Sequence, residues 1–219
     1  AVADTVVTPW NEIPELDESI AALILEPLPA NMGIVPPKSN FLLELRKACD
    51  EKGVLLIFDE VITGFRLAKG GASQWYGVQP DLWCFGKVIG GGLPMGAYAG
   101  SKELMSNVAP LGDVYQAGTL SGNPIATAAG IAQLQILNND AAYVSLTTAA
   151  KQLSDGLSEI FKTAGIEATV PRVGPLLGIF FTKSNPINFD QAQSAAENGM
   201  YAKFFHGMLR RGVALAPGP

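Results

Sequence analysis

Three stretches rich in apolar residues recur at intervals along the first half of the chain. They cover residues 21–26, 54–58 and 81–85, and each ends at a charged residue or a glycine. Successive apolar positions, rather than alternating ones, are typical of strands buried on both faces of a parallel sheet. The pattern therefore predicts three buried parallel strands, and GAYAG at residues 96–100 indicates a fourth.

Between these stretches the apolar residues repeat at helical spacing instead. Phe41 and Leu45 share one face of a predicted helix, and Gly53 ends it. Further helices are expected at residues 70–78 and 121–139, the second with Pro124 in its first turn. Strands that alternate with helices predict a doubly wound α/β sheet that is mostly parallel.

From about residue 140 the pattern changes. The predicted order is a helix at residues 141–164, a strand at 176–182, a helix at 190–211 and a strand at 213–216. This order is typical of the start of a smaller α+β domain. We therefore expect a large domain over residues 1–139 and an incomplete small domain over residues 140–219.

Composition and charge narrow the class of protein. Of the 219 residues, 48% are hydrophobic, which is enough to bury a large core, and the net charge is −5. An acidic chain without a basic run does not favour nucleic acid or an anionic membrane as a partner. The sequence has no apolar stretch as long as a membrane span and no signal-peptide pattern, so a cytoplasmic protein is expected.

Cysteine and histidine usage limits the chemistry further. Cys49 and Cys84 lie in apolar surroundings without CxxC spacing, which is typical of reduced, buried thiols. His206 is the one histidine of the sequence, so His-rich metal sites and Ser-His-Asp triads are excluded and no metal is expected. The chain starts without Met and stops just after a predicted strand, so we expect a fragment of a longer protein.

Charged residues follow the predicted strands at the ends where open α/β sheets bind ligands. They are Glu26, the pair Asp59–Glu60, and Lys87, which ends a predicted buried strand and precedes glycines 90–92. Each has a structural alternative, namely a polar strand exit, a cap of the following turn, or a tight glycine connection. Together, an acid and a lysine from neighbouring strand ends would converge on one crevice.

Pyridoxal phosphate is a cofactor that uses such a pair. A lysine binds it as a Schiff base, and an acid opposite the pyridine nitrogen keeps that nitrogen protonated, so that the ring accepts electrons. A P-loop NTPase also places an acid after an apolar strand. However, FGKV lacks the Ser or Thr that follows the P-loop lysine, and Asp81 stands where that motif needs glycine. The P-loop alternative therefore requires a motif upstream of this chain.

Longer motifs resemble a known family. LLIFDEVITGFRLAKGGASQWYGVQPDLWCFGKVIGGGLPMGAYAG (residues 55–100) is similar to the class III, fold type I, pyridoxal-phosphate aminotransferases. DEVITGFRLAKGGA and YQAGTLSGNPIATAAGI (115–131) look closest to their glutamate-1-semialdehyde 2,1-aminomutase branch, and EPLPANMGIVPP (26–37) and FFHGMLRRGVALAP (204–217) also fit. The resemblance covers essentially the whole chain, as the second half or so of a full-length enzyme.

The resemblance assigns roles to five residues. Lys87 matches the Schiff-base lysine, and Asp59 matches the partner of the pyridine nitrogen. Val61 matches a residue packed on the ring face, and Asn31 a polar residue near the phenolic oxygen of the cofactor. Thr119 matches a threonine that reaches the cofactor phosphate of the neighbouring subunit, which implies a homodimer.

Two departures from the family pattern matter. Ala30 stands where the family usually has glycine, a change that could shift the loop carrying Asn31. The phosphate-binding loop and the ring-stacking aromatic residue of the family lie upstream of this chain, so the isolated fragment is expected to be inactive. Glu26 falls on a family position close to the site but receives no definite role.

The resemblance also implies an activity. It is the isomerisation of glutamate 1-semialdehyde to 5-aminolevulinate in porphyrin synthesis, with pyridoxal phosphate and its pyridoxamine form as cofactors and Lys87 moving the protons. One alternative is a class III ω-aminotransferase of the ornithine, GABA or acetylornithine type. Another is a truncated chain that folds or dimerises without catalysis.

Overall fold

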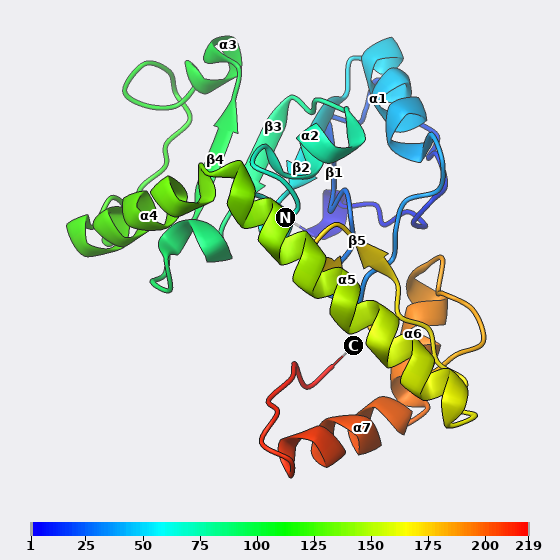
Figure 1. Ribbon diagram of the computed structural model, residues 1–219. Coiled ribbons are helices and arrows are strands. Elements are labelled where there is room, and N and C mark those ends of the chain that lie inside the picture. Colours follow the sequence, from blue (N-terminus) through cyan, green and yellow to red (C-terminus); the bar gives the residue numbers. More distant parts are fainter. Residues whose placement is uncertain (1, 219) are drawn as a thin grey trace. The chain divides into compact units, whose positions relative to one another are not determined.

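The computed structural model describes residues 2–218 of the chain (Figure 1). Internal contacts divide it into two compact units. We call Leu16–Pro27 together with Arg46–Leu146 the sheet unit, and the other described residues, most of which follow Leu146, the C-terminal unit. The expected domains, 1–139 and 140–219, follow a different division of the chain and stay a prediction.

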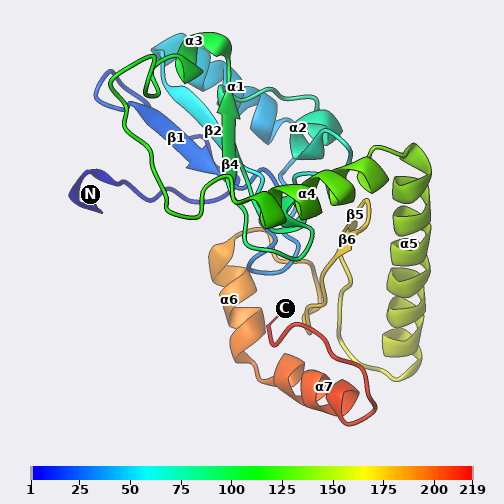
Figure 2. The same cartoon turned by 90° about the vertical axis from the view of Figure 1, so that its left-hand side faces the viewer.

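A four-stranded sheet forms the centre of the sheet unit (Figure 2). In order across the sheet, its strands are β1 (Ala22–Leu25), β2 (Leu55–Asp59), β3 (Leu82–Phe85) and β4 (Ala97–Gly100). The first three are parallel, whereas β4 is antiparallel to β3. The prediction of a mostly parallel α/β sheet is confirmed.

Burial differs between the strands. Leu56 and Phe58 of β2 are fully buried, as expected for a strand with a neighbour on each side. In β1, which has β2 as its one neighbour in the described sheet, Ile24 is 62% exposed. The expectation that the first strand is buried on both faces is therefore wrong for the described part of the chain, because β1 is an edge strand there.

Capping residues set where helices of the sheet unit begin and end. Asn123 caps α4 (Pro124–Leu137), because its Oδ1 accepts hydrogen bonds from the backbone N–H groups of Ile125 (3.0 Å) and Ala126 (3.2 Å). Pro124 occupies the first turn, as predicted. Gly53, with a φ of 67°, follows the end of α1 (Phe41–Lys52). The remaining elements are α2 (Gly71–Tyr76), the 3₁₀ turn η2 (Lys87–Gly90), α3 (Lys102–Met105) and the start of α5 (Asp140–Thr163).

The C-terminal unit packs around aromatic side chains. Phe161 of α5 contacts Phe181 and Phe204, with ring centroids 5.5 and 6.0 Å apart. Its elements are η1 (Val2–Asp4), the start of α1 as far as Leu45, the end of α5, the hairpin strands β5 (Arg172–Val173) and β6 (Leu176–Leu177), α6 (Phe189–Glu197) and α7 (Met200–Leu209).

Three predictions for this unit need correction. The strand expected at 176–182 is reduced to β6 and one further bridge, between Thr169 and Phe180. The helix expected at 190–211 is two helices, because Gly199 adopts a left-handed φ of 73° and stops the first. Residues 213–216 form no strand with any described residue, and the carbonyl of Ala216 instead accepts a hydrogen bond from the Tyr201 hydroxyl at 2.9 Å.

Candidate active site

Asp59 and Lys87 lie at the same edge of the sheet. Asp59 ends β2 and is the register partner of Cys84 in β3, and Lys87 follows Cys84 by three residues. Because β2 and β3 are parallel, their carboxyl ends share one edge, which we call the carboxyl edge. Burial and the nearby charge of Asp59 raise the pKa of the Cys84 thiol, which is half-buried rather than fully buried as expected.

The Asp59 carboxylate shapes the turn that follows it. Its Oδ1 accepts a hydrogen bond of 2.9 Å from the backbone N–H of Val61. The structural alternative for this residue, a cap of the following turn, is therefore correct. This is the one hydrogen bond that the Asp59 carboxylate forms with residues 2–218. Its Oδ2 is therefore available to bind another group.

Lys87 has an unusual backbone conformation. Its φ is 48°, in the left-handed region, where a residue with a Cβ atom costs roughly 1–2 kcal/mol. The side chain is exposed, contrary to the expected buried strand end, and it forms no ion pair with a described carboxylate. A strained, unpaired lysine at the end of a strand is typical of a functional site.

Val61 lies directly beside the backbone that precedes Lys87. A Cβ atom added to Gly86 would come within 3.2 Å of Val61 Cγ1. Glycine at position 86 therefore lets the turn after β2 approach the end of β3. This contact places the predicted ring-packing residue next to the predicted Schiff-base lysine.

The glycine run after Lys87 packs against protein. A Cβ atom on Gly91, whose φ is 58°, would lie 2.6 Å from the carbonyl oxygen of Ala129 in α4. In the same way, a Cβ atom on Gly130 of α4 would lie 2.4 Å from the carbonyl oxygen of Ile89. The structural alternative of a tight connection is thus correct at Gly91, since the close approach of η2 and α4 needs Gly91 and Gly130, whereas an added Cβ atom on Gly92 would meet no atom within 4 Å.

Sequence reasoning assigned no role to Glu60. Its side chain is 1% exposed and accepts four hydrogen bonds, listed here by donor: Thr63 Oγ1 (3.0 Å), Ala72 N (2.6 Å), Ser73 N (3.0 Å) and Ser73 Oγ (2.7 Å). Glu60 and Asp59 are thus adjacent carboxylates with different environments. The sequence did hold a signal for this network. An acid stands directly after a predicted strand, and a serine stands near the start of the next predicted helix.

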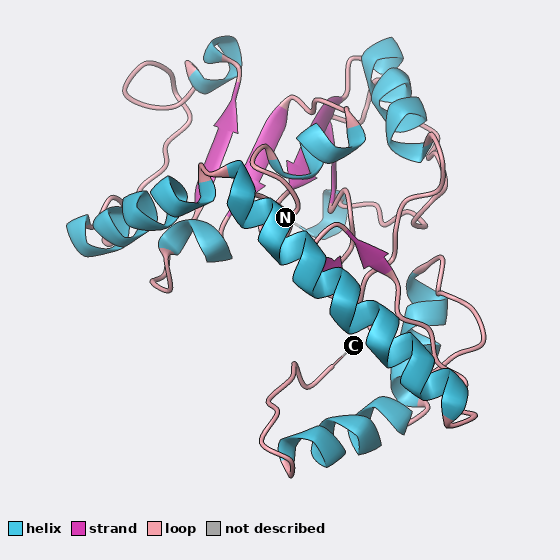
Figure 3. Ribbon diagram, in the orientation of Figure 1, coloured by secondary structure: helices cyan, strands magenta, loops and turns pink. Residues whose placement is uncertain are grey.

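Among the described residues, the structure shows no contact of the other predicted cofactor-binding residues, Thr119 and Asn31, with Asp59 or Lys87. Thr119 is exposed on the loop between α3 and α4, which appears as an extended pink segment in Figure 3. Asn31 is exposed and belongs to the C-terminal unit, where it forms a bridge with Gly33. Glu26 and Ala30 are half-buried. The roles assigned to Thr119 and Asn31 stay predictions.

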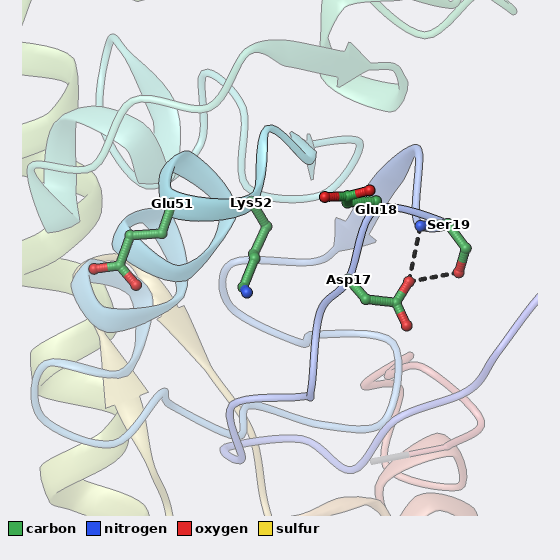
Figure 4. A pocket seen from close by; sticks show the side chains of 5 residues that line it. All are labelled: Asp17, Glu18, Ser19, Glu51 and Lys52. Atoms are coloured by element: carbon green, nitrogen blue, oxygen red, sulfur yellow. Dashed lines mark hydrogen bonds between the residues drawn. The ribbon is translucent and has the colours of Figure 1, made fainter.

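A hollow of about 470 Å³ lies elsewhere on the sheet unit (Figure 4). It is lined by Asp17, Glu18 and Ser19, which precede β1, and by Glu51 and Lys52, which end α1. These segments lead into the amino ends of β1 and β2, which we call the amino edge. Hydrogen bonds from the hydroxyl and backbone N–H of Ser19 lower the pKa of Asp17. The hollow is therefore at the opposite edge from Asp59 and Lys87.

The donor set at the carboxyl edge fits pyridoxal phosphate. A carboxylate with a free oxygen suits the protonated pyridine nitrogen, and an unpaired lysine suits the aldehyde. Within residues 2–218, no group of three His, Cys, Asp or Glu side chains is placed to hold a metal ion. None of the described helices combines the length and apolarity that crossing a membrane requires.

Comparisons with known proteins agree with this arrangement. The family Aminotransferase class-III matches residues 6–216. The chain belongs to the class-III aminotransferases. It is 52% identical to the glutamate-1-semialdehyde 2,1-aminomutase of Syntrophobacter fumaroxidans, over 99% of this chain and 51% of that protein, and 50% identical to that of Persephonella marina, over 97% and 51%. The chain thus spans about half the length of the curated relatives it matches.

Solved structures give the same result. A glutamate-1-semialdehyde-aminomutase (K286A) from Pseudomonas aeruginosa PAO1, in complex with PMP, superposes with a TM-score of 0.85 at 29% identity, over 96% of this chain and 49% of that chain. An omega-transaminase from Sphaerobacter thermophilus has a TM-score of 0.82 at 34% identity, over 90% and 45%. The fold is therefore that of the fold type I pyridoxal-phosphate-dependent transferases, as predicted.

Proposed function

We propose that the full-length protein is a cytoplasmic glutamate-1-semialdehyde 2,1-aminomutase that uses pyridoxal phosphate and its pyridoxamine form. In the net reaction, the amino group at C4 and the oxo group at C5 of 4-amino-5-oxopentanoate exchange places, which gives 5-aminolevulinate for porphyrin synthesis. The observation that carries the proposal is that the adjacent parallel strands β2 and β3 bring Asp59 and Lys87, which has a left-handed backbone, to the same carboxyl edge. Identities of about half the residues to named aminomutases support this substrate.

The residues of this chain divide the work. Bound pyridoxal phosphate supplies an electron sink for bonds at the amine-bearing carbon. Lys87 Nζ would hold the cofactor, and its amine would accept and return protons at C4 and C5 of the substrate. The Asp59 carboxylate keeps the pyridine nitrogen protonated by charge pairing, and Val61 packs against one face of the ring. Asn31 is the polar residue that the family resemblance assigns to the phenolic oxygen.

A substrate test separates this proposal from the ω-aminotransferase alternative. Given glutamate 1-semialdehyde alone, the full-length protein should form 5-aminolevulinate without an added keto acid. An absolute requirement for 2-oxoglutarate or pyruvate would favour the alternative, to which the likeness to an omega-transaminase gives some support. Borohydride reduction followed by peptide mapping should place the pyridoxyl group on Lys87, and a label on another lysine would contradict the assignment.

A homodimer is part of the proposal, with Thr119 contacting the cofactor phosphate of the neighbouring subunit. Large apolar side chains surround Thr119 on its loop: Tyr115 is 82% exposed and Leu120 is 73% exposed. Apolar side chains that are exposed together, rather than singly, are typical of interaction surfaces, and Leu111, Val114 and Ile125 of the same segment are also exposed. They support a loop that is covered by a second copy of the chain.

Mixed dimers test the shared site. If Thr119 acts across the interface, a dimer of one Thr119→Ala and one Lys87→Ala subunit contains one intact site and one site that carries both changes. Mixing the two variants should therefore give more activity than the sum of the separate variants. Activity equal to that sum, with subunit exchange shown by mass spectrometry, would place Thr119 in its own subunit's site.

A further inference from the structure

The buried carboxylate of Glu60 joins three segments of the sheet unit. Its Oε2 accepts hydrogen bonds from Thr63, in the turn after β2, and from the backbone N–H of Ala72 in α2. Its Oε1 accepts from the backbone N–H and the hydroxyl of Ser73. The Ser73 hydroxyl in turn accepts a hydrogen bond of 2.7 Å from Trp83 Nε1 in β3. The side chain therefore links the end of β2 to α2 and, through Ser73, to β3.

The backbone of Glu60 makes a second connection to the same strands. Its N–H donates to the carbonyl of Cys84 at 2.9 Å, and its own carbonyl accepts from the N–H of Gly64 at 2.8 Å. The residues on either side of Glu60 are the cofactor-facing Asp59 and Val61. A shift of Glu60 therefore moves both of them relative to the backbone of Gly86 and Lys87.

The network carries no compensating positive charge. Across the part of the chain that the structure describes, Glu60 forms no ion pair with Lys, Arg or His, and its four donors are neutral groups. Burying an ion without a counter-ion is costly, and an apolar side chain of similar size is often as stabilising. Stability alone does not explain a carboxylate at this position, whereas four fixed acceptor directions do.

We propose that Glu60 is a positioning residue for the cofactor site. The Glu60 carboxylate holds the turn of Asp59 and Val61 in register with Lys87. The Asp59 carboxylate and the Lys87 amine are then positioned to bind the same cofactor ring. The identity of the ligand in this inference rests on the proposed function. The positioning of Asp59 and Val61 by Glu60 does not depend on that function.

The test compares Glu60→Gln with Asp81→Asn in the full-length protein. Both variants turn a carboxylate into an amide beside β3. Asp81 lies at the amino edge, where its Oδ2 accepts from Arg46 Nη1 and Leu56 N, both at 2.7 Å. In Glu60→Gln, the amide NH₂ faces two donors in place of an acceptor, so the network cannot be complete.

The first readout is hydrogen–deuterium exchange of the cofactor-free protein. Glu60→Gln should raise exchange in peptides covering residues 59–64 and 84–90 more than in the rest of the sheet unit, whereas Asp81→Asn should raise exchange in these peptides no more than in the rest of that unit. This comparison does not depend on the proposed function. Unchanged exchange in Glu60→Gln would overturn the inference even if the aminomutase activity is confirmed.

The second readout is the bound cofactor. Glu60→Gln should change the pH dependence of the cofactor absorbance band and lower kcat by on the order of ten- to hundredfold, with KM changed less. Asp81→Asn should leave the absorbance profile as in the unsubstituted protein. If the unsubstituted protein takes no pyridoxal phosphate, the proposed function fails and the exchange result still decides the role of Glu60. An unchanged absorbance profile in Glu60→Gln would reduce Glu60 to a purely structural residue.

A milder variant covers the case in which Glu60→Gln does not fold. Ser73→Ala removes the hydroxyl that joins Glu60 to Trp83 but keeps the other donors to the carboxylate. It should raise exchange at residues 84–90 more than at 59–64. If both peptides exchange at the same rate in Ser73→Ala as in the unsubstituted protein, the link from Glu60 to β3 is contradicted.

Discussion

Charged groups lie at both ends of β3, but those at one end form ion pairs and those at the other end do not. At the amino edge, Asp81 Oδ2 lies 2.7 Å from Arg46 Nη1, and Arg46 Nη2 lies 2.7 Å from Asp50 Oδ1. At the carboxyl edge, neither Asp59 nor Lys87 forms an ion pair with any residue that the structure describes. The group of Asp81, Arg46 and Asp50 at the amino edge thus pairs its charges internally, whereas Asp59 and Lys87 at the carboxyl edge have no ion pair with a described residue.

The pKa of Arg46 reflects this internal pairing. Burial acts to lower the pKa, but the hydrogen bonds and charges of Asp81 and Asp50 outweigh burial and raise it. The Arg46 guanidinium therefore stabilises the fold through its ion pairs with Asp81 and Asp50. The comparison teaches that a charge network seen in a fold is not by itself a site, and that unpaired charges at a strained backbone are the more informative feature.

The largest expected effect is at Lys87. Lys87→Ala in the full-length protein should abolish detectable turnover, because no other group can bind the cofactor covalently at this place. Stability should change by less than about 0.5 kcal/mol, since the side chain is exposed. The measurements are turnover and thermal unfolding. Lys52→Ala, at the amino edge, is the matched control and should keep full activity.

Asp59→Asn should have the next largest effect. The amide oxygen can still accept the hydrogen bond from Val61, so the turn should persist, but a neutral side chain cannot hold the pyridine proton by charge. We expect turnover to fall by on the order of a hundredfold or more. Steady-state kinetics measure the loss, and near-normal turnover would show that the ring nitrogen is protonated by another group.

Asp81→Asn should affect stability rather than activity. It replaces a charge-assisted bond to Arg46, a kind of bond worth about 1.5–3 kcal/mol, with at best a neutral one. The expected result is a lower urea midpoint with unchanged turnover per folded molecule. Loss of turnover without loss of stability would break the contrast between the two edges.

The smallest expected effect concerns Tyr76, at the end of α2 opposite to the Glu60 network. Its hydroxyl is buried without a hydrogen-bond partner among the described residues, and burial raises its pKa. The unfolded chain then loses this proton first, so stability is full below about pH 10 and falls above it by up to about 1.4 kcal/mol per pH unit.

Tyr76→Phe should therefore gain about 1 kcal/mol at neutral pH and lose the alkaline sensitivity. Thermal unfolding at pH 8 and at pH 11 measures both effects. Tyr98→Phe is the control, because the Tyr98 side chain is 43% exposed rather than buried. A steeper alkaline loss in Tyr76→Phe than in the unsubstituted protein would contradict this account.

Much of the sheet unit could be predicted because each strand is a local apolar run. The four strands form within one residue of their predicted bounds, and the roles of Lys87 and Asp59 came from long motifs around them. The network of Glu60 could not be predicted in this way. Its partners in α2 lie more than ten residues away, and local sequence does not determine which carboxylate of an Asp-Glu pair turns inward.

The C-terminal unit was harder because its elements depend on contacts. Asn198–Gly199 is a turn signal inside the predicted helix 190–211. Asn198 Oδ1 accepts a hydrogen bond of 2.9 Å from Met200 N, the first residue of α7. The signal was present but was outweighed by the surrounding alanine-rich pattern. Residues 213–216 have strand composition, but a strand also needs a neighbour, and composition cannot supply one.

The left-handed backbone at Lys87 places two selections in conflict. Selection for folding alone would favour glycine there, because glycine adopts a φ of 48° without steric cost. Selection for chemistry demands an amine, which glycine lacks. A library randomised at position 87 and sorted for soluble expression should therefore be enriched in glycine and asparagine. If Lys87 holds the cofactor as proposed, the same library sorted for 5-aminolevulinate production should return lysine, and the two sorts should differ at this position.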